Sequence, residues 1–412
     1  MNKITFLVLI IGFSLSVKAQ INGQDTENAN PITTAVPFLT IAPESRSGAM
    51  GDIGVATTPD INSIKYNVAK YPFSESEYGV SISYTPWLRS LVSDINLLFL
   101  SGYTKLDDKQ VLSGSLTYFS LGSIQFLDDA GSFIKDYTPN EFAFKFGYSR
   151  LLTDQLSLGI SLGYVYSNLT GGYTNSATES TAGNSFAADI GLFYTDDINI
   201  DGKDANYAFG FSITDIGNKM SYSSGVEKNF IPTTLRLGGA FTIDLDDYNS
   251  IMVSAEASKL LVPTPPIYYE QGDVIAPGDT VLSGDDRIGE VRYGKSPNVS
   301  VGTGMFQSFA DAPGIVQSDG SRSVFQEEIK EVMWGVGVEY WYAKQFALRG
   351  GYFHESTMKG NRKFFSAGIG LKYNVFGLDF AYLIPSNGNQ SPLANTLRFT
   401  LSFDFAALEG EK

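Results

Sequence analysis

The chain carries one histidine, His354, which is followed by Glu355. A hydrolase of the Ser-His-Asp kind would have to use that imidazole as its general base. The stretch from Gly159 to Gly163 matches the pattern Gly-x-Ser-x-Gly, with Ser161 at its centre. That pattern supplies a nucleophile only at a sharp turn between a strand and a helix, whereas here it lies inside an alternating, strand-like segment. We therefore predict no catalytic residues and no enzyme activity.

A second pattern could bind a metal ion. Asp197, Asn199, Asp201 and Gly202 have the spacing of the first half of an EF-hand loop, but the twelfth position is Ala208. A complete site needs a bidentate Glu there, so we expect a polar turn instead. The chain also has no cysteine, which excludes thiolate ligands and disulfides. We expect no bound metal and no cofactor.

The segment from Tyr78 to Phe405 repeats one kind of unit about fourteen times, with apolar positions alternating with small or polar ones. In the last unit Leu397 and Phe399 share one parity, and Arg398 has the other. Successive side chains of a strand point to opposite faces. Strands of soluble proteins average about 5 to 6 residues, whereas a strand across a bilayer needs about 9 to 11. The length of these units predicts an all-β, antiparallel transmembrane β-barrel.

The connections predict the number and direction of the strands. Long and short linkers alternate along nearly the whole series, as in bacterial outer-membrane barrels, which have short periplasmic turns, long extracellular loops and an even number of strands. Counting the segment from Asn298 to Phe306 would make fifteen strands, so we place it in a long loop as a short helix reaching Phe309. Fourteen strands are expected, at 78–86, 95–104, 109–121, 141–152, 155–168, 183–195, 205–217, 231–243, 249–260, 332–342, 345–354, 362–373, 376–384 and 396–405.

The ends of the chain predict its location. Residues 1–19 contain Lys3, an apolar run from Ile4 to Leu15, and Ala19, which is typical of a secretory signal peptide cleaved after Ala19. Without cysteine the mature chain has no lipoprotein anchor. An exported barrel of this kind indicates the outer membrane of a Gram-negative bacterium. Residues 406–412 are expected to form a short C-terminal tail.

Residues 20–77 lack the alternating repeat. They could hang in the periplasm or fold into the barrel as a plug, and their apolar residues, among them Phe38 and Ile53, favour the plug. The glycines in this stretch are not followed by the Gly-Lys-Ser/Thr sequence of a phosphate loop, and glycine permits close packing of backbones. We expect structural contacts inside the barrel from Arg46, Gly48, Gly51, Asp52, Gly54 and Asn67.

The net charge of −15 makes nucleic acid a poor partner, because nucleic-acid binding depends on cationic contacts with phosphates. Several charged residues of the repeats have the parity opposite to the apolar one and should face the lumen, where charges usually pair. Two interpretations stay open, a paired structural network inside a plugged barrel or a selective lining for a passing solute. These residues are Lys145, Asp189, Arg236, Glu256, Glu339, Arg349, Lys372, Arg398 and Asp404.

Aromatic residues concentrate at strand ends and in one loop. Tyrosines near strand ends would suit the interfacial belts of a membrane protein: Tyr84, Tyr103, Tyr118, Tyr148, Tyr194, Tyr207, Tyr352 and Tyr373. The segment 261–331 is too long for a simple connection. Its exposed aromatic and Met side chains would suit contact with a protein partner, or would pack on the loop itself as a lid. The residues concerned are Tyr268, Tyr269, Met305, Phe306 and Phe309.

The segment from Ala35 to Asp60, followed by Asn67-Val68-Ala69, resembles the N-terminal hallmark of the PorV/PorQ family, and the stretch from Met305 to Gly314 resembles a loop motif of that family. The resemblance covers essentially the mature chain. It implies an architecture like that of the FadL fatty-acid channel, a fourteen-stranded barrel with an N-terminal plug. Val68 departs from the Asn-Pro-Ala motif of FadL-like proteins, which weakens any inference of a shared channel mechanism.

The resemblance implies a role in the type IX secretion system of Bacteroidetes. Such proteins bind the C-terminal signal domain of secreted cargo, take it from the SprA/Sov translocon and deliver it to the attachment complex that contains the PorU sortase. The loops 261–331, 122–140 and 218–230 would then form the cargo surface, while lipid-facing strands, which also contact outer-membrane lipid, dock the translocon. Two alternatives remain, a FadL-like transporter of hydrophobic small molecules and a lipid-modifying enzyme that uses His354.

Overall fold

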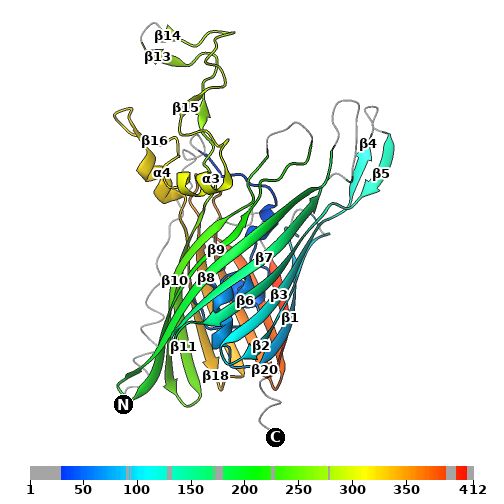
Figure 1. Cartoon of the computed structure of the whole chain (residues 1–412), viewed down its shortest axis with the longest axis vertical. Helices are drawn as coiled ribbons and strands as arrows, with labels where there is room; N and C mark the ends of the chain where they lie inside the picture. The colour runs from blue at the N-terminus through cyan, green and yellow to red at the C-terminus, as the bar shows by residue number, and fades with distance from the viewer. Residues whose placement is uncertain are drawn as a thin grey trace.

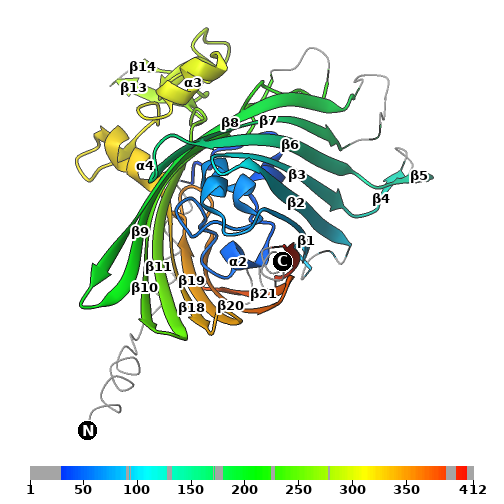
Figure 2. The same cartoon turned by 60° about the horizontal axis from the view of Figure 1, so that its bottom comes forward.

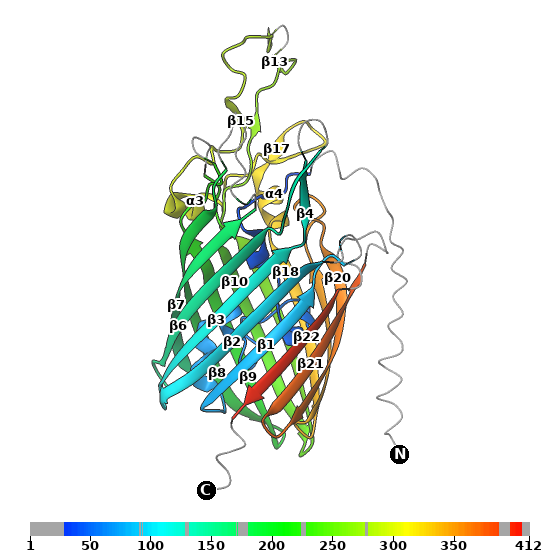
Figure 3. The same ribbon diagram turned by 90° about the vertical axis from the view of Figure 1, so that its right-hand side faces the viewer.

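The structure, a computed structural model, describes residues 29–89, 92, 94–127, 132–169, 171, 180–223, 228–276, 279–386 and 396–405. Within these ranges the chain forms a closed barrel of fourteen antiparallel strands (Figures 1 and 3). Each strand pairs with its neighbour in the chain, and the last pairs back with the first through Gly79 and Asp404. None of the described helices is long and apolar enough to cross a membrane.

The barrel strands confirm the predicted number and differ from the predicted bounds by a few residues. They are β1 (Tyr78–Pro86), β2 (Ile95–Asp107), β3 (Gln110–Leu121), β6 (Asn140–Leu151), β7 (Leu156–Asn168), β8 (Gly183–Ile200), β9 (Lys203–Gly217), β10 (Thr234–Asp246), β11 (Asn249–Leu260), β18 (Met333–Tyr342), β19 (Phe346–His354), β20 (Lys363–Tyr373), β21 (Phe376–Pro385) and β22 (Leu397–Asp404). We call the rim with the short turns the periplasmic rim and the opposite one the extracellular rim.

The alternation in sequence becomes an outer apolar face and an inner polar one. In β1, Val80 and Ile82 are exposed on the outside, whereas Ser81 and Ser83 are buried inside. An exposed apolar belt is stable only against lipid, because in water it would form an apolar patch far larger than monomeric soluble proteins tolerate. The outer face is therefore the lipid face.

Smaller elements extend from the extracellular rim. The hairpin of β4 (Ile124–Leu127) and β5 (Phe133–Tyr137) leans outward from the barrel (Figure 2). The long loop between β11 and β18 contains α3 (Val301–Gln307), α4 (Val324–Lys330) and the short strands β12 (Ile267–Tyr268), β13 (Val274–Ala276), β14 (Asp279–Thr280), β15 (Val291–Tyr293), β16 (Ile315–Val316) and β17 (Arg322–Ser323). The helix α3 confirms that Asn298 to Phe306 is not a barrel strand.

The first described part of the chain lies inside the barrel (Figure 2). It begins at the extracellular rim, where the Asn30 N–H donates to Met358 O at 2.8 Å, and ends at the periplasmic rim, where Glu77 O accepts from Lys105 N at 2.7 Å. We call residues 30–77 the inner segment. Its turns are η2 (Pro37–Thr40), α2 (Ser45–Gly48), η3 (Ser63–Lys65) and η4 (Val68–Phe73). The predicted signal peptide and C-terminal tail fall outside the described residues.

Two sequence predictions about local structure were wrong. The linker expected from Asp196 to Asp204 is a two-residue turn, in which Asp201 and Gly202 have φ angles of 50° and 81°. Such left-handed pairs form the tight hairpin turn that matches the twist of two strands, so β8 and β9 continue pairing through residues that resemble a polar loop. Tyr103 does not join the lipid-facing belt, because its parity points it inward, where its ring lies 5.0 Å from that of Tyr71.

Glycine on the inner wall sets how closely the inner segment can approach. A Cβ on Gly351 would lie 2.2 Å from the carbonyl carbon of Met50, and one on Gly210 would lie 2.0 Å from Val55 O. Carbon atoms in contact normally stay about 3.5–4.0 Å apart. The inner segment therefore fits only a wall that lacks side chains at these points.

We predict that Gly351→Val destabilises the barrel by at least about 1–3 kcal/mol, the usual cost of overpacking. The matched control is Gly350→Ala, because the neighbouring Gly350 faces the opposite way and its Cβ would meet only Ser366 O at 3.9 Å. The measurement is the temperature at which the folded barrel loses its characteristic electrophoretic mobility. Equal melting of both variants and the parent protein would show that the inner segment does not press on this wall.

Candidate functional site

Buried ion pairs join the inner segment to the barrel wall. Arg46 donates from Nε and Nη2 to the carboxylate of Glu339 at 2.9 and 2.7 Å, and from Nη1 to Asp60 at 2.9 Å. Glu339 also accepts from Arg349 Nε at 2.6 Å, and Arg349 pairs with Asp379 at 2.5 Å. A carboxylate with so little exposed surface needs such charge-assisted bonds, because burial of an unpaired charge is strongly unfavourable.

The other luminal charges are paired in the same way. Lys145 contacts Asp189 and Asp215, both at 2.8 Å, and Asp189 also accepts a hydrogen bond from Ser161. The remaining pairs are Arg236 with Glu256, Lys372 with Asp404 and Arg398 with Asp52. Every luminal charge predicted from the sequence thus has a partner, as the structural-network interpretation requires.

The inner-segment residues singled out in the sequence all make local contacts. Asn67 donates to Val55 O and Leu192 O, and its oxygen accepts the Ala69 N–H that begins η4. Gly54 N–H donates to Glu256 at 2.8 Å. The other contacts are those of Gly48 beside the Arg398 side chain, Gly51 against the Tyr352 backbone and Asp52 with Arg398.

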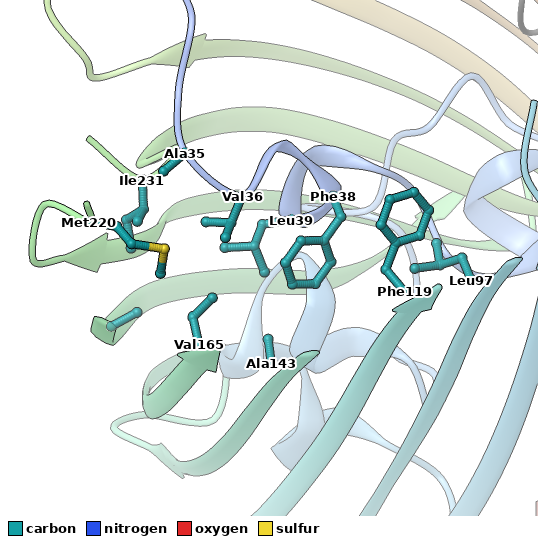
Figure 4. Packing of buried hydrophobic residues seen from close by; sticks show 11 residues of the cluster. Ala35, Val36, Phe38, Leu39, Leu97, Phe119, Ala143, Val165, Met220 and Ile231 are labelled. Carbon is teal, nitrogen blue, oxygen red and sulfur yellow. The ribbon is translucent and has the colours of Figure 1, made fainter. Parts of the chain in front are cut away.

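The extracellular half of the lumen is filled by apolar side chains. Phe38 of η2 stacks on Phe119 of β3, with ring centroids 6.0 Å apart, and Val36 and Leu39 pack beside them (Figure 4). The cluster also contains Ala35, Leu97, Ala143, Val165, Ala187, Met220 and Ile231. The space in which a hydrophobic molecule could be held is therefore occupied by the chain itself.

The periplasmic half of the lumen contains a cavity of about 840 Å³ below the inner segment. Its lining includes the periplasmic turn residues Asp154 and Gln155 together with Asp60, Phe73 and Met252. Because the lining mixes carboxylates, hydroxyl groups and a few apolar side chains, the cavity suits water better than a hydrophobic ligand.

A second cluster of buried charges anchors the base of the long extracellular loop. Lys259 at the end of β11 contacts Glu328 and Glu331, and Lys359 contacts Glu327 at 2.7 Å and Glu331 at 2.9 Å. The carboxylates of α4 also accept N–H groups from the backbone near Asp311. We call the part of the loop fixed in this way, residues 261–332, the platform.

The sequence did not identify this platform anchor, because Lys259 lies 72 positions from Glu331 and Lys359 lies 32 positions from Glu327 along the chain. One local signal was available. Ser323, followed three residues later by Gln326, has the spacing of a capping box, and the Ser323 hydroxyl accepts the Gln326 N–H at 3.4 Å. This signal predicts where α4 begins but not which of its faces is buried.

The loop residues proposed for partner contact differ in exposure. Phe306 is 83% exposed, and Phe309 and Tyr268 are about half as exposed. Tyr269 lies under the guanidinium of Arg292 at 5.6 Å, and Met305 is half-buried. Phe306 is therefore the member of the set most available to a partner.

The patterns that resembled catalytic or metal sites are not assembled into such sites. Ser161 faces the lumen, whereas His354 lies on the outer face, stacked on Trp334 at 5.1 Å. Asp201 and Gly202 form the β8–β9 turn. In the described ranges no group of three or more His, Cys, Asp or Glu side chains could hold a metal ion.

Comparison with known proteins gives one family. The sequence matches the family described as "Type IX secretion system protein PorV" over residues 24–267, more than half of the chain. No curated protein sequence matches it.

Several solved structures are distantly similar. They include the toluene transporter TbuX of Ralstonia pickettii (TM-score 0.41, 10% identity, covering 90% of this chain and 99% of that one). A FadL homologue of Pseudomonas aeruginosa has a TM-score of 0.42 and 12% identity, covering 92% of this chain and 100% of its own. The toluene transporter TodX of P. putida has a TM-score of 0.45 and 12% identity, with 89% and 99% covered. Likeness at this level carries no inference about transport.

We predict that Arg46→Ala lowers the free energy of unfolding by about 3–5 kcal/mol, because it leaves a buried carboxylate with one partner fewer. The Arg46 and Glu339 side chains are 11% and 2% exposed. Lys372→Ala is the control, since the Lys372–Asp404 pair is 38% and 22% exposed and an exposed pair contributes about 0–1 kcal/mol. Urea unfolding in detergent measures both, and equal losses would contradict the difference in burial.

We predict that the platform loses stability as pH rises. Burial, together with the nearby carboxylates of Glu328 and Glu331, raises the pKa of Asp311 from 3.8 to about 7. Between these values the folded loop keeps a proton that the unfolded loop releases, so stability falls from about pH 4 to about pH 7. After correction for intrinsic exchange, the backbone amides of residues 261–332 should therefore exchange more slowly at pH 5 than at pH 8.

The matched variant for this pH test is Asp311→Asn, which removes the titrating group with little change in shape. We expect its corrected protection to vary less between the two pH values. If the platform of the parent protein becomes more protected as pH rises, the raised pKa of Asp311 is contradicted.

Proposed function

The chain belongs to the PorV family of type IX secretion system proteins, and on this premise we propose that it is an outer-membrane carrier of secreted proteins. In this proposal it binds the C-terminal signal domain of cargo and takes the cargo from the SprA/Sov translocon. It then delivers the cargo to the PorU-type attachment complex. The family match is the observation that carries the proposal.

The filled extracellular half of the lumen supports a carrier that acts through its surface. The apolar cluster around Phe38 occupies the extracellular half of the barrel, and the Arg46–Glu339 pair ties the inner segment to the wall. Moving that segment aside would expose several buried charges at once, which is costly. The inner segment therefore blocks the passage of a solute through the lumen, whereas the lipid-facing strands and the platform remain available for binding proteins.

The platform is the surface that we assign to cargo. Its base is fixed by Lys259 and Lys359, so its exposed side chains are presented on a rigid support. Phe306 lies in the last turn of α3 and is exposed, and large aromatic side chains contribute strongly to protein interfaces. We assign the lipid-facing strands to the translocon contact.

We predict that the tagged protein, purified from its native outer membrane in mild detergent, brings with it a very large barrel protein and secreted proteins that share a C-terminal domain. Phe306→Asp should reduce cargo recovery about tenfold, the effect of losing about 1.4 kcal/mol of binding energy. Val316→Asp is the control, because Val316 is 47% exposed on the same loop but lies outside the proposed contact set. Mass spectrometry of the purified material measures both.

Two results would remove Phe306 from the cargo contact: equal loss of cargo in both variants, and cargo recovery unchanged by Phe306→Asp. A third result would count against the carrier itself. Recovery of the barrel alone with bound fatty acid or a similar lipid would favour the FadL-like transporter of hydrophobic molecules.

The proposal also predicts no role for the histidine. His354→Ala should leave secretion unchanged, because the imidazole lies on the outer face among aromatic rings. The measurement is the amount of cargo in the culture medium, together with lipase and esterase assays of the purified protein. A hydrolase activity that is present in the parent and absent in His354→Ala would overturn the non-catalytic assignment.

A further inference from the structure

The helix α4 has its acidic residues inside and its apolar residues outside. Glu327 and Glu328 are 1% and 8% exposed, whereas Phe325 and Ile329 are 72% and 54% exposed. A helix on a water-exposed surface normally shows the opposite arrangement. Phe325 and Ile329 are one turn apart, so they form a single apolar stripe.

The ion pairs of the platform fix this orientation. Glu327 is held by Lys359 and Glu328 by Lys259, and each carboxylate also accepts backbone N–H groups. Turning the helix to bury its apolar stripe would break these bonds and leave Lys259 and Lys359 with Glu331 as their shared carboxylate partner. The ion pairs of Glu327 and Glu328 therefore keep the apolar stripe on the exposed side of the helix.

The helix lies at the rim of the lipid-facing wall, on the side opposite the β4–β5 hairpin (Figures 1 and 2). It ends at Lys330, four residues before Trp334, and so within about 14 Å of it, given the reach of an extended chain. Trp334 is 41% exposed on the outer face and stacks on His354. Lys330 is exposed at the end of α4, and Lys363 lies directly opposite His354 in the register of β19 and β20.

Aromatic rings and lysines at the end of an apolar belt are the usual composition of a membrane interface. We propose that α4 lies in the outer-leaflet interface, with Phe325 and Ile329 at the boundary of the acyl chains and with Lys330 and Lys363 facing phosphate groups of the glycolipid headgroups. The two lysines complement an anionic headgroup.

The size of the stripe favours lipid over a protein partner. Two side chains one turn apart cover far less than the roughly 1,200–2,000 Å² buried in a stable protein interface. An amphipathic helix with an aromatic and an aliphatic side chain on one face can lie in the plane of the membrane interface, and α4 ends on an exposed lysine, Lys330. This contact would hold the platform at the height of the membrane, and it does not depend on the secretion role.

The absence of cysteine from the chain makes single labelling sites available. Cysteine replaces Phe325 or Ile329, with Gln326→Cys on the next side of the helix and Leu282→Cys, a site 69% exposed on the protruding part of the loop, as controls. Each full-length variant, checked for folded-barrel mobility, receives an environment-sensitive fluorophore and enters vesicles whose lipids carry a nitroxide at the top of the acyl chain. We expect quenching at 325 and 329 at least about twofold stronger than at 282, and weaker quenching at 326 than at 325.

Quenching at 325 and 329 no stronger than at 282 would overturn the proposal and would leave a protein partner as the occupant of this face. The headgroup part has its own test, in vesicles of phosphatidylcholine with or without a bisphosphorylated glycolipid. The glycolipid should strengthen quenching at 325, and Lys330→Gln with Lys363→Gln should abolish that gain. A probe indifferent to the glycolipid in the parent protein would overturn the phosphate contact.

Discussion

The constraint on which this structure depends is that charges inside a membrane barrel must find partners within it. Glu339 on the wall meets Arg349 from the next strand and Arg46 from the inner segment, with bonds of 2.6 to 2.9 Å. Because none of these three charges could stay buried without a partner, the strand register and the position of the inner segment stabilise each other. The close approach of Met50 to Gly351 then follows from where Arg46 must lie.

The same principle organises the outside of the molecule. Lys259 and Lys359 form ion pairs with the acidic residues in and beside α4, which anchors the base of the long loop on the barrel rim. Phe325 and Ile329 are then left on the exposed side of the helix. Apolar packing fills the extracellular half of the lumen, and paired buried charges anchor the platform.

Much of the fold could be predicted from the sequence, because alternation and linker length are local properties. They located the barrel strands and kept the α3 segment out of the wall. Local patterns failed where a contact between distant residues decides the outcome. Tyr103 turns inward to meet Tyr71 of the inner segment, and the β8–β9 hairpin continues through residues that look like a loop.

The candidate site divides in the same manner. Parity identified the luminal charges, yet it could not pair Arg46 with Glu339, which lie 293 positions apart. The aromatic residues of the loop were visible, but their exposure depends on packing, which leaves Phe306 free and Tyr269 under Arg292. The anchor of the platform was missed because Lys259 meets Glu331 only after the whole loop has folded.

The proposed carrier functions with its inner segment seated in the lumen. Ser45 and Thr400 test it most directly, because their hydroxyl oxygens lie 3.1 Å apart across the boundary between the inner segment and β22. Replacing both with cysteine places two sulfur atoms where a disulfide can form, and the measurement is cargo secretion by cells carrying the oxidised variant. If the inner segment stays seated, secretion should equal that of either single-cysteine variant. Secretion that is lost on oxidation and returns on reduction would contradict it.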